Sequence, residues 1–162
     1  MNQRNNHLLK RTRVMTLIMI VGLVLSGLTA IPLVWELDFL VRLFGDGSGW
    51  LAEWLLKVND ALHYTAEYNN FLHYGTDWLA FAHIVIAIVF WGAFQDPVWN
   101  RWLFKFGMIV CVAIIPWAVV FGEVRGIPLL WRGIDCLFGI IGFVPMWFGW
   151  KWTGEVENEP TG

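Results

Sequence analysis

The sequence predicts an all-α fold: a four-helix transmembrane bundle with an extracytoplasmic amphipathic surface helix between the first and second spans. Composition is the first observation behind this prediction. Of 162 residues, 57% are hydrophobic and only 15% are charged, whereas soluble domains carry about a quarter charged residues. The second observation is that the apolar residues fall into four separate runs, each of a length suited to crossing a hydrocarbon core of roughly 30 Å.

The first run predicts an uncleaved membrane span over residues 14–34. Residues 1–13 are polar and basic and are expected to form a cytoplasmic tail, after which no charge occurs until Glu36. A cleaved signal peptide is the competing interpretation. Its apolar core would be shorter and would end in an A-x-A-like site, whereas this run continues to Pro32 with Leu28 at the position where a small residue is needed.

An outer loop over residues 35–75 is expected to contain the surface helix. The segment 45–49, Gly-Asp-Gly-Ser-Gly, is a clear helix breaker. After it, apolar residues from Trp50 to Leu62 recur at spacings of three and four, with Glu53, Lys57 and other polar residues on the opposite face. This pattern predicts an amphipathic helix lying on the bilayer surface, with a shorter helix of the same kind over residues 35–44.

Three further spans complete a single membrane domain over residues 14–150. Pro97 marks the turn after the second span, and Pro128 marks the link before the fourth. The tail over residues 151–162 is acidic and is expected to be loose and cytoplasmic. The predicted bounds of these three spans are 78–94, 103–122 and 133–150.

Lysine and arginine residues predict the orientation. With the N-terminus inside, seven of them fall on the inner side and four on the outer side. This asymmetry favours a multi-pass membrane protein with both termini in the cytoplasm.

Small residues at helical spacing predict which side of each span faces the bundle. The second span has Thr76, Ala80, His83 and Ala87 on one narrow stripe. The other three spans each show such a seam. These seams consist of Gly22, Ser26 and Thr29 in the first span, Gly107, Cys111, Ala118 and Gly122 in the third, and Asp135, Gly139, Gly142, Met146 and Gly149 in the fourth.

Six ionisable residues are expected in the outer third of the bundle. Such groups are costly in hydrocarbon unless they are paired or hydrated, so their clustering predicts a polar pocket for a ligand or a partner. The residues are Asp77, His83, Glu123, Arg125, Arg132 and Asp135.

Three of these six residues are also suited to a purely structural role. His83 is suited to hydrogen bonding within the bundle, and Asp77 is suited to the first turn of its helix. Asp135 lies on a glycine seam and needs a partner, for which Arg132, Arg125 and His83 are the candidates.

A rival hypothesis is a metal-dependent enzyme at the outer membrane face. His63 with Glu67, and His73 with Asp77, have the i, i+4 spacing that places two metal ligands side by side on a helix. In this hypothesis Asp135 or His83 would act as acid or base. A third hypothesis is a proton-coupled carrier that uses His83 and Asp135.

Other classes are disfavoured. The net charge of −2 argues against a nucleic-acid partner. No cofactor is predicted, because a haem bound by two histidines needs ligands on facing spans and only His83 lies inside the membrane. The expected partners are the lipid bilayer and a membrane protein, which includes a second copy of this chain.

Four motifs resemble an uncharacterised family of small bacterial four-span inner-membrane proteins. The similarity covers roughly residues 14–150 and implies the bundle and the bacterial inner membrane, but no activity. The motifs are Tyr74-Gly-Thr-Asp-Trp-Leu-Ala-Phe-Ala-His-Ile-Val-Ile-Ala87, Asp96-Pro-Val-x-Asn100, Phe106-Gly-Met-Ile109 and Arg125-Gly-Ile-Pro-x-x-Trp-Arg-x-Ile-Asp-Cys136.

Taken together, these patterns favour a non-enzymatic integral membrane protein. The expected role is that of an accessory or interaction subunit, or of a binder of a small apolar ligand, acting through the outer-leaflet polar pocket.

Overall fold

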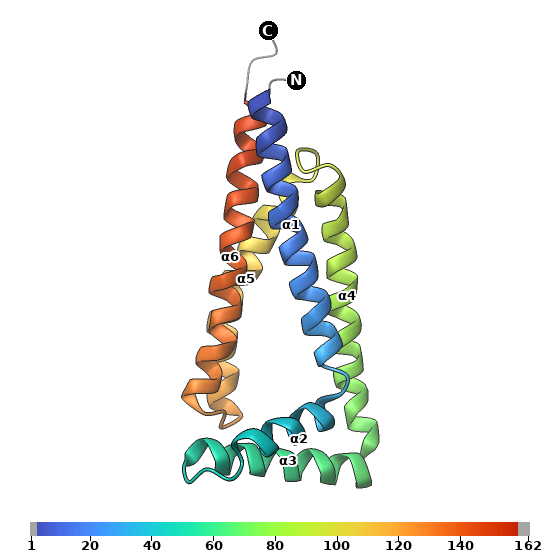
Figure 1. The fold of residues 1–162 in the computed structure, drawn as a ribbon, viewed down its shortest axis with the longest axis vertical. Helices are drawn as coiled ribbons and strands as arrows, with labels where there is room; N and C mark the ends of the chain where they lie inside the picture. The colour runs from blue at the N-terminus through green and yellow to red at the C-terminus, as the bar shows by residue number, and fades with distance from the viewer. Residues whose placement is uncertain (1–2, 159–162) are drawn as a thin grey trace. The chain divides into compact units, whose positions relative to one another are not determined.

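The computed structural model describes residues 3–158, which form helices and no strands. Six α-helices and one 3-10 helix follow one another along this part of the chain (Figure 1). They are α1 (Gln3–Thr29), α2 (Leu33–Phe44), α3 (Trp50–Tyr68), η1 (Asn70–His73), α4 (Tyr74–Gln95), α5 (Arg101–Val124) and α6 (Leu129–Glu157). The all-α prediction is therefore confirmed.

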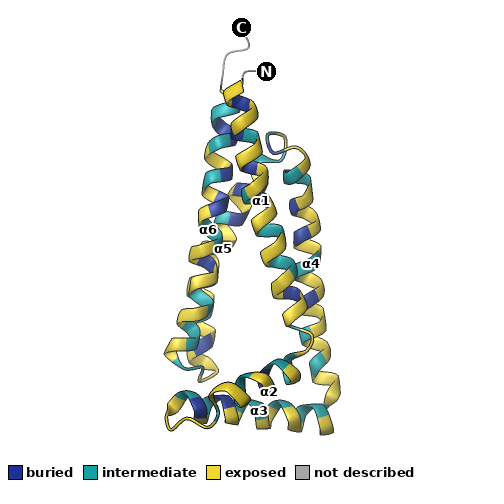
Figure 2. Cartoon of the chain, viewed as in Figure 1, coloured by how far each residue is buried: buried dark blue, intermediate teal, exposed yellow. Residues whose placement is uncertain are grey.

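Four of these helices are long and apolar enough to cross a membrane: α1, α4 together with η1, α5 and α6. In the most apolar window of each, only 17% to 22% of the residues are buried. Figure 2 shows many exposed residues on α1, α4 and α6. Apolar side chains exposed on this scale are suited to contact with lipid.

The chain divides into two compact units, and two helices pass from one to the other. The terminal unit comprises Met1–Val21 and Ala87–Gly162, and the middle unit comprises Gly22–Ile86. Both α1 and α4 are continuous through the boundary. Each unit is described below by itself.

The core of the terminal unit is the close approach of α5 and α6, which lie side by side (Figure 1). Glycines make it possible. A Cβ built on Gly139 would lie 2.5 Å from the carbonyl oxygen of Cys111, and one on Gly149 would lie 2.5 Å from the Phe104 ring. A Cβ on Gly107 would lie 2.6 Å from the sulfur of Met146. The seams predicted for the third and fourth spans therefore form this helix contact.

A Schellman motif ends α5 and starts the turn into α6. The amide of Ile127 donates to the carbonyl of Gly122 at 2.8 Å, and the amide of Gly126 donates to that of Glu123 at 3.0 Å. Gly126 has φ +67°, a left-handed conformation that costs a residue with a Cβ about 1 kcal/mol or more. Pro128 then directly precedes the first residue of α6.

The turn between α4 and α5 is closed by side chains. Asn100 donates from Nδ2 to the carbonyls of Gly92 and Asp96, each at 3.0 Å. Arg13 of α1 donates to the carbonyls of Phe94 and Gln95 at 3.1 and 3.2 Å. The last carbonyls of a helix have no partner within the helix, so these contacts satisfy the end of α4.

The middle unit contains a hairpin in which α2 and α3 pack side by side (Figure 1). Leu37 of α2 and Ala52 and Leu55 of α3 are its buried residues. Two helices form within the segment 35–75, as predicted, and their placement on the bilayer surface stays a prediction. Part of the apolar face of α3 packs against α2, while Trp35 and Phe39 of α2 stay exposed.

The same unit contains the contact between the end of α1 and the first half of α4. A Cβ on Gly27 would lie 2.9 Å from the Ala80 carbonyl oxygen and 3.0 Å from His83 Cβ. Ala80 is buried and His83 is half-buried, as the predicted stripe of the second span requires, and Ala87, where α4 enters the terminal unit, is also buried. Trp78, Val85 and Val89 on the other side are exposed.

The seam predicted for the first span is wrong. Gly22, Ser26 and Thr29 are all exposed, whereas Thr12 and Thr16 are fully buried. Each buried threonine donates its hydroxyl to the carbonyl four residues earlier, at 3.0 and 2.9 Å. A hydroxyl bonded within its own helix is satisfied without a partner helix, so a threonine can be buried as readily as a glycine.

Several predicted boundaries also change. Residues 3–13 of the predicted basic tail belong to α1. α6 continues to Glu157, so residues 151–157 are helical and not the loose tail that was predicted. α1 ends at Thr29, five residues before the predicted 34, because Pro32 cannot continue a helix and restricts Ile31. Residues 1–2 and 159–162 of the predicted tails lie outside the described residues.

Gly126→Ala should destabilise the protein by about 1 kcal/mol, because alanine must adopt the left-handed conformation that the Schellman motif needs. Gly133→Ala is the matched control. Gly133 lies inside α6 with nothing within 4 Å of an added Cβ, so alanine there should stabilise by about 0.5–1 kcal/mol. Unfolding by SDS in mixed micelles measures both. Equal effects of the same sign would contradict this account of the turn.

Candidate functional site

Glu123 and Arg132 form an ion pair where α5 ends and α6 begins. Arg132 donates from Nη1 to Oε2 of Glu123, and from Nε to the carbonyl of Ile127 at 2.7 Å. The Arg132 side chain is 12% exposed and the Glu123 side chain 76%. Arg132 thus binds both a carboxylate and the backbone of the turn, which is the arrangement that a forked guanidinium suits.

The stem of Arg132 is buried against the helix that precedes it. A Cβ on Gly122 would lie 2.7 Å from both Cγ and Cδ of Arg132. Glycine at this position therefore allows the arginine to lie flat across the end of α5. The Arg132 side chain holds the turn together, which is a structural role.

Asp135 and Arg125 behave differently from this pair. Asp135 is half-buried one turn along α6, and Arg125 is exposed in the turn. Within residues 3–158, neither makes a hydrogen bond or ion pair. Arg132, one of the partners predicted for Asp135, forms its ion pair with Glu123 instead. Asp135 is therefore the carboxylate of this group that is left for another partner.

His83 and Asp77 belong to the middle unit. The Nδ1–H of His83 donates to the carbonyl of Leu79 at 2.8 Å, one turn earlier in α4. This bond matches the structural role expected of His83. The predicted convergence of all six ionisable residues at one depth stays a prediction.

Asp77 lies in an open notch on α4 with three aromatic neighbours, Tyr74, Trp78 and Phe81. The notch has a volume of about 270 Å³. The Tyr74 and Trp78 rings meet edge to face with centroids 5.9 Å apart, and the Trp78 and Phe81 rings do so at 5.6 Å. We call this feature the Asp77 notch. Its chemistry is a single carboxylate surrounded by apolar rings.

The four predicted metal ligands do not gather. Within residues 3–158, no three His, Cys, Asp or Glu side chains are placed to hold a metal ion. His63 instead contacts Asp38 of α2, with Nε2 and Oδ1 2.8 Å apart. Nε2 of His73 is buried without a hydrogen-bond partner. The metal hypothesis for His63, Glu67, His73 and Asp77 thus gains no support from their geometry.

The contact between His63 and Asp38 joins α2 to α3. The hydrogen bond from His63 is the main cause that lowers the pKa of Asp38 below its usual 3.8, with smaller contributions from Asn59 and from the charges of His63 and Arg42. Asp38 was not among the predicted site residues. The i, i+4 pattern on α3 pointed to Glu67 instead, while the actual partner is on another helix.

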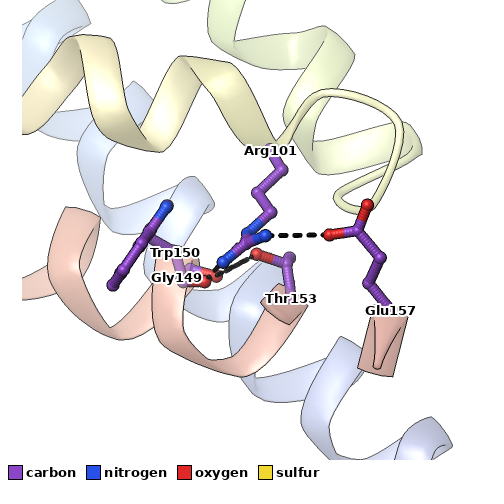
Figure 3. Close-up of polar contacts among 5 residues, drawn as sticks. All are labelled: Arg101, Gly149, Trp150, Thr153 and Glu157. Carbon is purple, nitrogen blue, oxygen red and sulfur yellow. Dashed lines mark hydrogen bonds and ion pairs between the residues drawn. The ribbon is translucent and has the colours of Figure 1, made fainter. Parts of the chain in front are cut away.

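A second polar cluster, which sequence reasoning missed, joins the start of α5 to the end of α6 (Figure 3). Arg101 donates from Nε to the carbonyl of Trp150 at 3.3 Å and from Nη1 to Glu157 at 2.8 Å. Its guanidinium carbon lies 5.0 Å from the centre of the Trp150 ring. The hydroxyl of Thr153, which is fully buried, donates to the carbonyl of Gly149 at 2.7 Å.

The first helix also reaches the end of α6. Arg4 binds Glu155 at 3.2 Å, and the guanidinium carbon of Arg11 lies 6.0 Å from the centre of the Trp152 ring. A basic start and an acidic end of the chain are the sequence signal for this contact. The two segments were predicted as separate tails on the cytoplasmic side, and no contact between them was predicted.

Comparison with known proteins adds no assignment. No family model, no curated protein and no solved structure matches the chain. The resemblance based on the motif from Tyr74 to Ala87 stays a prediction. Two of the quoted motifs have clear structural roles, since Asp96-Pro-Val-x-Asn100 closes the turn after α4 and Arg125-Gly-Ile-Pro128 ends α5.

Arg132→Gln should destabilise the protein by about 1.5–3 kcal/mol, because it removes charge-assisted hydrogen bonds from a largely buried group. Arg132→Lys keeps the charge but loses the Nε donor to Ile127, so its effect should be intermediate. Arg125→Gln removes the same charge from an exposed residue and should stay within about 0.5 kcal/mol. Denaturant unfolding in micelles tests all three, and equal losses for Arg125→Gln and Arg132→Gln would refute this role.

Acid should loosen the contact between α2 and α3. Because the pKa of Asp38 is lowered in the folded state, its contribution is fully present above the ordinary value of 3.8 and is lost as pH falls through the lowered value. The hydrogen-exchange protection factors of amides in α2 and α3, which correct for the intrinsic pH dependence of exchange, should therefore fall below about pH 4. Asp38→Asn should remove much of this acid dependence, while Asp60→Asn, an exposed residue of α3, should retain it. An unchanged acid response in Asp38→Asn would contradict the assignment.

Proposed function

We propose that this chain is a small integral membrane protein that binds a small, largely apolar ligand and carries out no chemistry on it. It resides in a bacterial inner membrane with both termini in the cytoplasm, and it serves there as an accessory subunit or ligand carrier. The observation that supports this best is the Asp77 notch.

The Asp77 notch combines the features of a ligand site in one place. Small-molecule sites are mostly apolar and aromatic and contain few polar groups, which orient the ligand. The notch has three aromatic walls and one carboxylate, which makes no ion pair with another described residue. A ligand that fits it is apolar and carries one cationic or hydrogen-bond-donating group, which faces Asp77.

The position of the notch also suits a ligand that arrives through lipid. Tyr74 and Asp77 lie in the first turn of α4, at the entrance of a helix long enough to span the membrane. Tyr and Trp side chains are favoured at membrane interfaces, where one end is apolar and the other is hydrated. The side chains of Tyr74, Trp78 and Phe81 are all more than half exposed, so they are accessible from outside the protein.

The experiment is purification from native membranes followed by mass spectrometry of whatever remains bound. The wild-type protein should retain a small molecule or a partner subunit. Asp77→Asn keeps the size of the side chain and removes its charge, so retention of a ligand that faces the carboxylate should fall by roughly tenfold or more. Trp78→Ala should weaken binding through the lost aromatic wall.

Asp60→Asn is the matched control, because it removes one exposed carboxylate from α3 of the same unit without touching the notch. It should retain the ligand at the wild-type level. Recovery of the wild-type protein as a lone species, with neither ligand nor partner, would refute the proposal. Equal loss in Asp60→Asn and Asp77→Asn would show that the notch is not the site.

A further inference from the structure

A second notch lies on α1, in the terminal unit, where polar sequence gives way to the apolar run. It is lined by His7, Lys10, Arg11, Val14 and Met15, and its volume is about 260 Å³. Residues 7, 10, 11, 14 and 15 are spaced by three and four, so they share one face of the helix. The nitrogen-bearing side chains of His7, Lys10 and Arg11 line the part of the notch nearer the start of α1. The apolar side chains of Val14 and Met15 line the part farther along the helix.

The cations of this notch are not neutralised by the protein. Among residues 3–158, His7 and Lys10 make no hydrogen bond or ion pair, and the contact of Arg11 is with an aromatic ring. Two other arginines of the same unit do bind oxygen atoms of the protein. Arg101 binds Glu157, and Arg13 donates to the carbonyls that end α4. Positive charge is therefore left over at the notch, although the end of α6 carries acidic residues.

Arg11 is held in place by α6. Its guanidinium carbon lies 6.0 Å from the centre of the Trp152 ring, within the range of a cation–π contact. This contact satisfies the face of the guanidinium and leaves its edge donors free for an anion. Part of the site is thus ordered before a ligand arrives, which lowers the entropic cost of binding.

We propose that this α1 notch binds the phosphate of an anionic phospholipid. Lys10 and Arg11 bind the phosphate oxygens, His7 lies beside the headgroup, and an acyl chain lies along Val14 and Met15. The apolar half of the notch distinguishes a lipid from free phosphate, because an inorganic anion has nothing to place against Val14. α1 is long and apolar enough to span a membrane, so the basic residues near its start lie at headgroup depth.

The test titrates the full-length protein in micelles with phosphatidylglycerol or with phosphatidylcholine of the same acyl chains, and counts bound lipid by native mass spectrometry. The wild-type protein should prefer the anionic lipid. Each basic residue near the surface contributes about fivefold in affinity, so Lys10→Gln with Arg11→Gln should weaken binding of the anionic lipid by about 25-fold. Binding of the zwitterionic lipid should weaken much less, because the choline cation already offsets the attraction of its phosphate for the two basic residues. Equal affinity of the wild-type protein for the two lipids would overturn the proposal.

Two variants separate the site from general charge and from misfolding. Lys105→Gln removes an exposed cation of α5 outside the notch and should keep the wild-type preference. Lys10→Arg keeps the positive charge and should also keep the preference for the anionic lipid, so it tests the site even if the double variant folds poorly. An equal loss in Lys105→Gln, or loss in Lys10→Arg of a well-folded sample, would show that the notch is not the site.

The source of the phosphate is tested in the same assay. Inorganic phosphate and glycerol phosphate, added in large excess, should leave most of the phosphatidylglycerol bound, since neither contacts Val14 or Met15. Displacement of the lipid by inorganic phosphate at comparable free concentration would overturn the lipid proposal and indicate a site for free phosphate.

Discussion

The packing of α5 against α6 determines how the terminal unit is organised, and it depends on backbone atoms approaching at glycine. Gly139 packs against the Cys111 carbonyl, and Gly149 packs against the ring of Phe104. Lipid is as apolar as a leucine side chain, so burial of apolar surface gives little net attraction between helices within a membrane. The attraction between α5 and α6 must therefore come from close packing of their atoms. Gly107 lets Met146 and Phe90 fill the space beside it, and both of these side chains are almost fully buried.

Polar contacts close this helix pair at both ends. Arg132 binds Glu123 where the chain turns, and Arg101 binds Glu157 at the opposite end of α6. Both arginines also donate to a backbone carbonyl. The acid and base at each end therefore neutralise one another within the protein. Asp77 on α4, Asp135 on α6, and His7 and Lys10 on α1 are among the described ionisable residues that have no such partner.

Local pattern was enough to predict much of the fold, and its failures have a common cause. The glycine seams of α5 and α6 were visible because glycine weakens a helix, so its recurrence at helical spacing indicates a close helix contact. Thr12 and Thr16 were overlooked because a threonine near a basic segment resembles a solvated residue, and only their own helix carbonyls account for their burial. The pairing of Arg4 with Glu155 joins residues 151 positions apart, a separation that no local window spans.

The candidate site was predictable to a similar extent. Charge at the ends of the spans identified Glu123 and Arg132, but not that the two bind one another, since their contact depends on the turn that Gly126 permits. His63 was predicted as a site residue, but with Glu67 as its partner. Helical spacing points to Glu67, while Asp38 is brought to it by the packing of α2 on α3.

The contacts between the first and last helices have a consequence for biosynthesis. α5 and α6 are neighbours in sequence and joined by a four-residue turn, so they can pair as soon as both have left the ribosome. The segment of α1 that carries Arg4 and Arg11 must wait for Glu155 and Trp152, which lie in α6 and are translated after the other described helices. During that interval its threonine hydroxyls are already bonded within the helix. The nascent first helix can therefore reside in lipid without an unsatisfied hydroxyl until its partner is made.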